Sequence, residues 1–133
     1  MLQTLDLSNC EYLNDGLMVN MLLKTTSLTA LSLSGNVNVT DESTARLPAT
    51  IRRLFLDRCP GVTDRSVVSA ATLCPLLCEF DLRGNQAITD TGLLALLDKS
   101  TNLHTLDIRG CPVSGALTER LKKLVGPLAF ESA

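Results

Sequence analysis

A nine-residue pattern that recurs along the chain limits the folds open to this sequence more than any other feature. The pattern is L-x-x-L-x-L-x-x-(N/C), with Ile or Phe at some Leu positions, and its copies occupy 2–10, 28–36, 51–59, 77–85 and 103–111. Successive copies begin 26, 23, 26 and 26 residues apart. Each copy alternates apolar and polar residues, which is typical of a short β-strand with one buried face. Five copies in register predict a chain built from repeated strand units.

A second motif follows each of the first four copies, three residues after the Cys or Asn position, at 13–15, 39–41, 62–64 and 88–90. Its Thr (or Asn) and Asp side chains can accept hydrogen bonds from the free N–H groups of a helix start, so we expect a helix after each strand. The second repeat is shorter and contains Pro48, which reduces its helix to a turn or so. Helical spacing predicts inward side chains at Met18, Met21, Leu22, Val67, Ala70, Ala71, Leu93, Leu96 and Leu97.

These repeats resemble those of the leucine-rich repeat family, over residues 2 to about 125. The 26-residue period, the Cys at the turn and the Thr-Asp helix start are similar to its cysteine-containing subtype, which is familiar from the substrate-recognition domains of F-box proteins. The ribonuclease-inhibitor type is also similar, but its repeats are longer, at about 28 to 29 residues.

The resemblance implies an α/β fold, a right-handed solenoid of about five repeats with a parallel sheet on the concave side and helices on the convex side. We expect the repeat domain to occupy 1–126, with a closing amphipathic helix near 115–125 that carries Leu117, Leu121 and Leu124, and a C-terminal tail at 127–133. Asn36 and Asn85 should bond to backbone groups of neighbouring turns, and small thiols should fill the same slot at Cys10, Cys59 and Cys111.

Composition agrees with a thin, aliphatic core. About one residue in five is Leu, whereas aromatic residues make up 3% and Trp is absent. Charged residues make up 20%, with a net charge of −2, which argues against a nucleic-acid-binding surface and a disordered chain. The odd number of five Cys residues indicates reduced thiols. No signal peptide or membrane span is apparent, so we expect a cytoplasmic or nuclear location without membrane contact.

Few residues suit catalysis or metal binding. His104 is the single His, and register places it one strand from Cys78, a pairing that repeat register alone explains. Cys74 and Cys78 lack enough partners for a zinc site, and Gly84 and Gly110 stand singly in turns. We therefore expect a non-enzymatic protein with no catalytic residues, no metal and no cofactor.

A candidate binding surface remains on the outward side of the strands. Neighbouring strands lie about 4.8 Å apart, so one patch should contain Arg53, Phe55, Asp57, Glu79, Asp81, Arg83, Asp107 and Arg109. Phe55 places an aromatic ring where the other repeats have Asp or Ser. An exposed aromatic among arginines has the composition of a binding hot spot. The alternative is that Arg and Asp pair across strands and only solvate the sheet, with their stems shielding Phe55.

The sequence therefore predicts a non-catalytic module that binds a protein partner through the concave sheet. The resemblance to the cysteine-containing subtype implies that this binding serves substrate recognition in a ubiquitin ligase. The alternative is a structural or assembly segment. The first strand begins at Leu2 without a polar cap, so its edge could continue a longer array, stack on a partner or self-associate, or could simply be a frayed edge strand.

Overall fold

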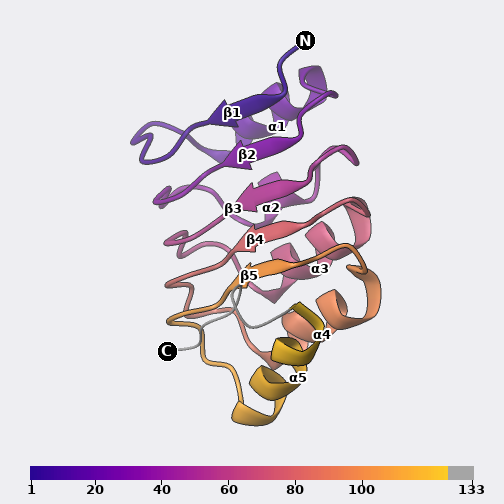
Figure 1. The fold of residues 1–133 in the computed structure, drawn as a ribbon. Helices are drawn as coiled ribbons and strands as arrows, with labels where there is room; N and C mark the ends of the chain where they lie inside the picture. The colour runs from indigo at the N-terminus through magenta and orange to yellow at the C-terminus, as the bar shows by residue number, and fades with distance from the viewer. Residues whose placement is uncertain (126–133) are drawn as a thin grey trace.

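The computed structural model describes residues 1–125, with the side chains of 1–123. The predicted alternation of strands and helices is confirmed (Figure 1). The elements are β1 (Thr4–Asp6), α1 (Asp15–Lys24), β2 (Ala30–Ser32), α2 (Asp41–Thr44), β3 (Arg53–Phe55), α3 (Asp64–Leu73), β4 (Glu79–Asp81), α4 (Asp90–Lys99), β5 (Thr105–Asp107) and α5 (Gly115–Val125). The predicted tail at 127–133 and the Leu124 side chain lie outside the described residues.

All five strands form one parallel sheet in chain order, β1-β2-β3-β4-β5. Figure 1 shows the strands stacked on one side of the molecule and the helices on the other. The register pairs the same repeat position in every strand, so that Arg53 lies opposite Glu79, and Phe55 lies opposite Asp81. The outward side chains therefore form straight columns across the sheet, as the repeat alignment predicts. We call this side of the sheet the strand face.

The core is a stack of thin aliphatic layers between strands and helices. The central residues of β2 to β5, which are Leu31, Leu54, Phe80 and Leu106, have no exposed surface. Of the predicted inward helix residues, Met18, Leu22, Val67, Ala70, Ala71, Leu93 and Leu96 are buried. Met21 and Leu97 are only partly buried, although they pack against the core, because they lie at the edge of a narrow apolar helix stripe.

The turns after β2 to β5 use the Asn or Cys side chain as predicted, whereas Cys10 after β1 is only partly buried. The Asn85 side chain accepts the N–H of Cys59 at 2.8 Å and donates to the carbonyl of Leu56 at 2.8 Å. Asn36 makes equivalent bonds to Cys10 and Leu7. The Cys59 thiol donates to the carbonyl of Leu33 at 3.1 Å. These bonds satisfy buried backbone groups where one repeat turns over its neighbour.

The helix starts differ from the expectation in one respect. The Thr side chain caps its own helix, at Thr40, Thr63 and Thr89. The Asp that follows instead accepts hydrogen bonds from the next repeat. The Asp41 carboxylate accepts the Thr63 N–H at 2.9 Å, the Thr63 hydroxyl at 2.6 Å and the Ser66 hydroxyl at 2.5 Å. We call the four residues that reach forward in this way, Asp15, Asp41, Asp64 and Asp90, the Asp ladder.

Candidate functional site: the strand face of the last three repeats

The eight predicted site residues lie together on β3, β4, β5 and the turns that follow these strands. We call this set, Arg53, Phe55, Asp57, Glu79, Asp81, Arg83, Asp107 and Arg109, the strand-face patch. The sheet register brings its members side by side, because β3 pairs with β4 and β4 pairs with β5 at the same repeat positions. A single surface therefore receives side chains from three repeats.

Burial divides the strand-face patch into two layers. The side chains of Arg53, Arg83 and Arg109 are 44–56% exposed. Asp57 and Asp81 are buried, at 5% and 8% exposure. Repeat spacing alone places all eight residues on the surface, whereas the structure sets these two carboxylates beneath the arginines. A partner on this face would therefore meet guanidinium groups first.

The buried Asp81 and the partly buried Asp107 hold Arg83 and Arg109 in position. Arg83 donates to Asp81 through Nη2 at 2.8 Å, and its Nε lies 3.3 Å from Asp107. Arg109 donates to Asp107 through Nη2 at 2.6 Å. Hydrogen bonding to Asp81 raises the pKa of Arg83. Burial opposes ionisation of Asp107, but hydrogen bonds from Arg109 outweigh it and hold the Asp107 pKa below its ordinary value. These pairs are charged and preorganised at neutral pH.

Phe55 is partly buried, which lies between the two interpretations, an exposed ring and a ring shielded by arginine stems. The guanidinium carbon of Arg53 lies 5.6 Å from the centre of the Phe55 ring, within the range of a cation–π contact. The same guanidinium donates to Glu79 across the strands at 2.8 Å. Arg53 and Glu79 are 56% and 30% exposed, so their ion pair is weak and can exchange for a partner's groups.

The first two repeats present a different surface, made mostly of small or hydroxyl side chains together with Asp6. Ser8 and Ser32 lie 2.7 Å apart through their hydroxyl oxygens, and Ser32 and Ser34 lie 3.2 Å apart. Ser34 donates to the buried Asp57 at 2.5 Å. The strand face thus changes at β3 from hydroxyl groups to an aromatic ring with charged groups. The part of the strand face from β3 to β5 is therefore the better candidate for specific recognition of a partner.

A hollow of about 400 Å³ adjoins the strand-face patch and is lined by Asp57, Arg58, Arg83 and Gly84. Sequence reasoning missed Arg58, because this residue lies in the turn beyond the outward columns. The signal was present in the repeat alignment, where the same position is Gly35, Gly84 or Gly110 in three other repeats. We call these four lining residues the arginine hollow.

The residues considered for catalysis have separate partners. The Cys78 thiol donates to the carbonyl of Arg52 at 3.2 Å, and Nδ1 of the exposed His104 ring lies 3.1 Å from the Thr105 hydroxyl. Burial raises the pKa of the Cys74 thiol to about 12, which makes it a poor nucleophile. Within residues 1–123, no cluster of three or more His, Cys, Asp or Glu side chains could hold a metal ion.

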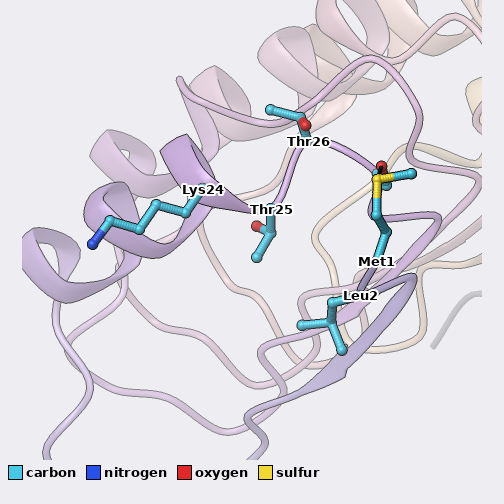
Figure 2. A pocket seen from close by; sticks show the side chains of 6 residues that line it. Met1, Leu2, Lys24, Thr25 and Thr26 are labelled. Carbon is cyan, nitrogen blue, oxygen red and sulfur yellow. Dashed lines mark hydrogen bonds between the residues drawn. The ribbon is translucent and has the colours of Figure 1, made fainter.

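A second, smaller hollow of about 90 Å³ lies at the β1 end of the molecule. It is lined by Met1, Leu2, Lys24, Thr25, Thr26 and Ser27. Figure 2 shows Lys24 extending away from Met1 and Leu2. Leu2 is 50% exposed. Its lining combines apolar Met1 and Leu2 with the polar residues at the end of α1. As for membranes, none of the helices within residues 1–125 is long and apolar enough to cross one.

Comparison with known proteins supports the reading of the repeats. The family model described as "Leucine Rich repeat" matches residues 24–43, 74–97 and 99–116. Antagonist of mitotic exit network protein 1 of Eremothecium gossypii is 36% identical over 107 residues, which cover 75% of this chain and 27% of that protein. Its Saccharomyces cerevisiae namesake is 38% identical over 96 residues, which cover 67% of this chain and 17% of that protein.

The name of a plant relative includes the leucine-rich repeat. F-box/LRR-repeat protein 12 of Arabidopsis thaliana is 37% identical over 87 residues, which cover 62% of this chain and 22% of that protein. The chain spans about a quarter of the length of these relatives, or less. The matched repeats agree with the five parallel strands that alternate with helices. The chain therefore contains leucine-rich repeats, folded as an α/β solenoid.

Proposed function

We propose that this chain is a non-catalytic module that binds a protein partner through the strand-face patch. The observation that carries the proposal is Phe55, a partly buried ring under Arg53, in a patch that also contains the exposed Arg83 and Arg109. Aromatic and arginine side chains supply most of the binding energy at protein interfaces. Repeat proteins of this architecture offer such an extended face for binding.

The electrostatics of the patch support a protein partner over a nucleic acid. Each exposed arginine has a carboxylate within ion-pair distance, namely Glu79, Asp81 or Asp107. The patch therefore carries both signs of charge, and such a surface recognises a complementary mixed surface. A phosphate backbone would require an excess of basic groups that this face does not present.

The finer proposal is that the module recognises substrates for a ubiquitin ligase. It is supported by the resemblance of the repeats to F-box substrate receptors and by the 37% identity to F-box/LRR-repeat protein 12. The strand-face patch would then contact the substrate, while the rest of the ligase would be supplied outside these repeats.

The test is affinity capture with quantitative mass spectrometry, using the wild-type chain and the Phe55→Ala and Arg83→Ala variants. We expect both variants to retain less of the specific partner while keeping the wild-type circular dichroism spectrum. Leu94→Ala is the matched control, because Leu94 is an apolar residue, 45% exposed, on α4 of the helix side. Unchanged capture by both strand-face variants, or a loss with Leu94→Ala alone, would place the binding surface elsewhere.

The ubiquitin-ligase role has its own readout. Proteins captured in a Phe55-dependent way should accumulate in cells when the proteasome is inhibited, and should carry ubiquitin. If Phe55-dependent partners exist but their abundance and ubiquitin content do not change, the ligase role fails while the interaction role stands.

A further inference from the structure

The carboxylate of Asp6 differs from the other carboxylates in its column of the strand face. The sheet register aligns Asp6 with Asp81 and Asp107 at the same repeat position. Asp81 and Asp107 each accept hydrogen bonds from the arginine two residues further along the chain. In the first repeat that position is Ser8. Asp6 is therefore the carboxylate of this column whose charge is not balanced by its own repeat.

The surroundings of Asp6 keep its charge available. Asp6 is exposed, and the Ser8 hydroxyl and the Ser8 N–H both donate to its Oδ1. These bonds hold the pKa of Asp6 below its ordinary value, so the group is ionised at neutral pH. Within residues 1–123, no basic side chain forms an ion pair with Asp6. Arg58 instead pairs with the buried Asp57. The β1 end of the strand face is therefore negatively charged.

A row of hydroxyl groups runs across the strand face from Asp6. The oxygens in contact, in order, belong to Asp6, Ser8, Ser32, Ser34 and Asp57, and the successive distances are 2.6, 2.7, 3.2 and 2.5 Å. Carboxylates only accept, so Ser8 donates to Asp6 and Ser34 donates to Asp57. Ser32 then has one proton for its two contacts. The 3.2 Å contact between Ser32 and Ser34 is the one that lacks a proton, because it is the longest.

The row therefore has acceptors to offer and no donor to spare. Ser32 is partly exposed, and with its proton directed to Ser8 its oxygen can accept a bond from a partner. Ser8 lies between Ser32 and Asp6 and contacts both. A group that carries a positive charge, several donors and no acceptor complements this arrangement.

The fourth and fifth repeats indicate which cation fits. Arg83 donates to Oδ1 of Asp81 through its backbone N–H and Nε, and to Oδ2 through Nη2. Ser8 makes the two bonds to Oδ1 of Asp6, and Oδ2 accepts no bond from the described residues. The position of a single cationic nitrogen is thus left open at Asp6. The ammonium group of lysine is compact and has three rotatable donors, so it suits one carboxylate oxygen and a neighbouring hydroxyl.

We propose that Asp6 and Ser32, bridged by Ser8, bind a lysine side chain of the protein partner. This inference rests on the proposed function, because it extends the same interface from the strand-face patch to the first two repeats. Phe55 lies two strands from Asp6 in the same column, at about 10 Å. An extended chain rises about 3.3 Å per residue. A partner segment that crosses the strands therefore carries its lysine about three residues from the residue that contacts Phe55.

The experiment is selection of a random twelve-residue peptide library on the wild-type protein, followed by affinity measurements on variants. Asp6→Asn removes the charge and keeps the oxygen that accepts from Ser8. Asp98→Asn is the matched control, because it makes the same change at an exposed residue of α4 on the helix side. We expect selected peptides to share a lysine about three positions from an apolar residue. They should bind about three- to tenfold more weakly to Asp6→Asn and equally well to Asp98→Asn.

A second variant fills the site from within the chain. Ser8→Arg gives the first repeat the Asp-x-Arg sequence of the fourth and fifth repeats. The new guanidinium should bond to Asp6 and weaken peptide binding as Asp6→Asn does, while both variants keep the wild-type circular dichroism spectrum. Wild-type affinity in Ser8→Arg would contradict the proposed contact.

Synthetic versions of a selected peptide test the lysine itself. Replacing the lysine by glutamine should reduce binding to wild type and have little further effect on binding to Asp6→Asn. Replacing it by arginine should also weaken binding to wild type, and tighter binding would overturn the assignment of lysine. The absence of a shared lysine, or equal binding to wild type and Asp6→Asn, would overturn the inference. Peptides that lose binding with Phe55→Ala but not with Asp6→Asn would leave the proposed function standing and reject this inference alone.

Discussion

Among single residues, Arg58 has the left-handed backbone conformation that glycine has at the same position of three other repeats. A non-glycine residue in the left-handed region costs about 1–2 kcal/mol. The bond from the exposed Arg58 guanidinium to the buried Asp57 carboxylate returns a similar amount, about 1–2 kcal/mol. We therefore expect Arg58→Gly to keep the free energy of unfolding within about 1 kcal/mol of wild type, or to raise it. Urea unfolding followed by circular dichroism at pH 7 measures this. A fall well beyond 1 kcal/mol would show that the chain keeps Arg58 for stability.

The five thiols should also differ in reactivity. Burial raises the pKa of Cys59, raises that of Cys74 to about 12 and raises that of Cys111 to about 11. Cys10 and Cys78 are only partly buried. Iodoacetamide at pH 8 should therefore modify Cys10 and Cys78 in the native protein, and all five thiols in concentrated guanidinium chloride.

Peptide mass mapping at several times after mixing identifies the modified thiols. Rapid native modification of Cys74 would contradict the packing of α3 against the sheet, because Cys74 ends that helix within the core.

Among strands and helices, the Asp ladder couples each helix start to the next repeat. Burial by itself raises the pKa of Asp15 and of Asp41, but hydrogen bonds from the next repeat outweigh it and hold both pKa values below the ordinary value. A lowered folded-state pKa contributes stability above the unfolded-state pKa of about 3.9. That contribution is lost as the pH falls through the folded-state pKa.

Asp41→Asn tests this coupling. The neutral amide keeps the shape of the side chain but weakens the bonds to Thr63 and Ser66, which should lower the free energy of unfolding by about 2 kcal/mol at pH 7. The difference from wild type should shrink as the pH falls from 4 toward 2, because the wild-type carboxyl is then protonated. Thermal unfolding over this pH range measures it. A difference that stays constant would mean that the Asp41 charge does not contribute to stability.

The sequence predicts the features that depend on spacing within one repeat. It does not predict the features that depend on packing between repeats. The strand positions, the short α2 and the roles of Asn36 and Asn85 follow from spacing and turn chemistry within the repeat. The Asp ladder did not, because a carboxylate at a helix start can bond to its own helix or to a neighbour, and only packing decides. Burial of Asp57 and Asp81 likewise goes with the side chains that bond to them, Arg58 and Arg83, which a column alignment does not reveal.

For the molecule as a whole, we expect the central repeats to contribute more to the free energy of unfolding than the first repeat. Each repeat of a solenoid contacts only its neighbours, and Leu54 in the central strand is fully buried whereas Leu5 in β1 is only partly buried. Leu54→Ala should lower the free energy of unfolding by about 2–5 kcal/mol, and Leu5→Ala by clearly less. Urea unfolding of both variants tests the difference. Equal losses would mean that the first layer is packed as tightly as the centre.

The central claim is that the strand face around Phe55 contacts a protein partner, and site-specific crosslinking tests it most directly. A photoreactive p-benzoylphenylalanine would replace Phe55 in one variant and Leu94, on the helix side, in the other, each expressed in the cells from which the chain derives. We predict that irradiation joins a discrete protein to the Phe55 variant and not to the Leu94 variant. Crosslinks from Leu94 alone, or from neither position, would contradict the claim.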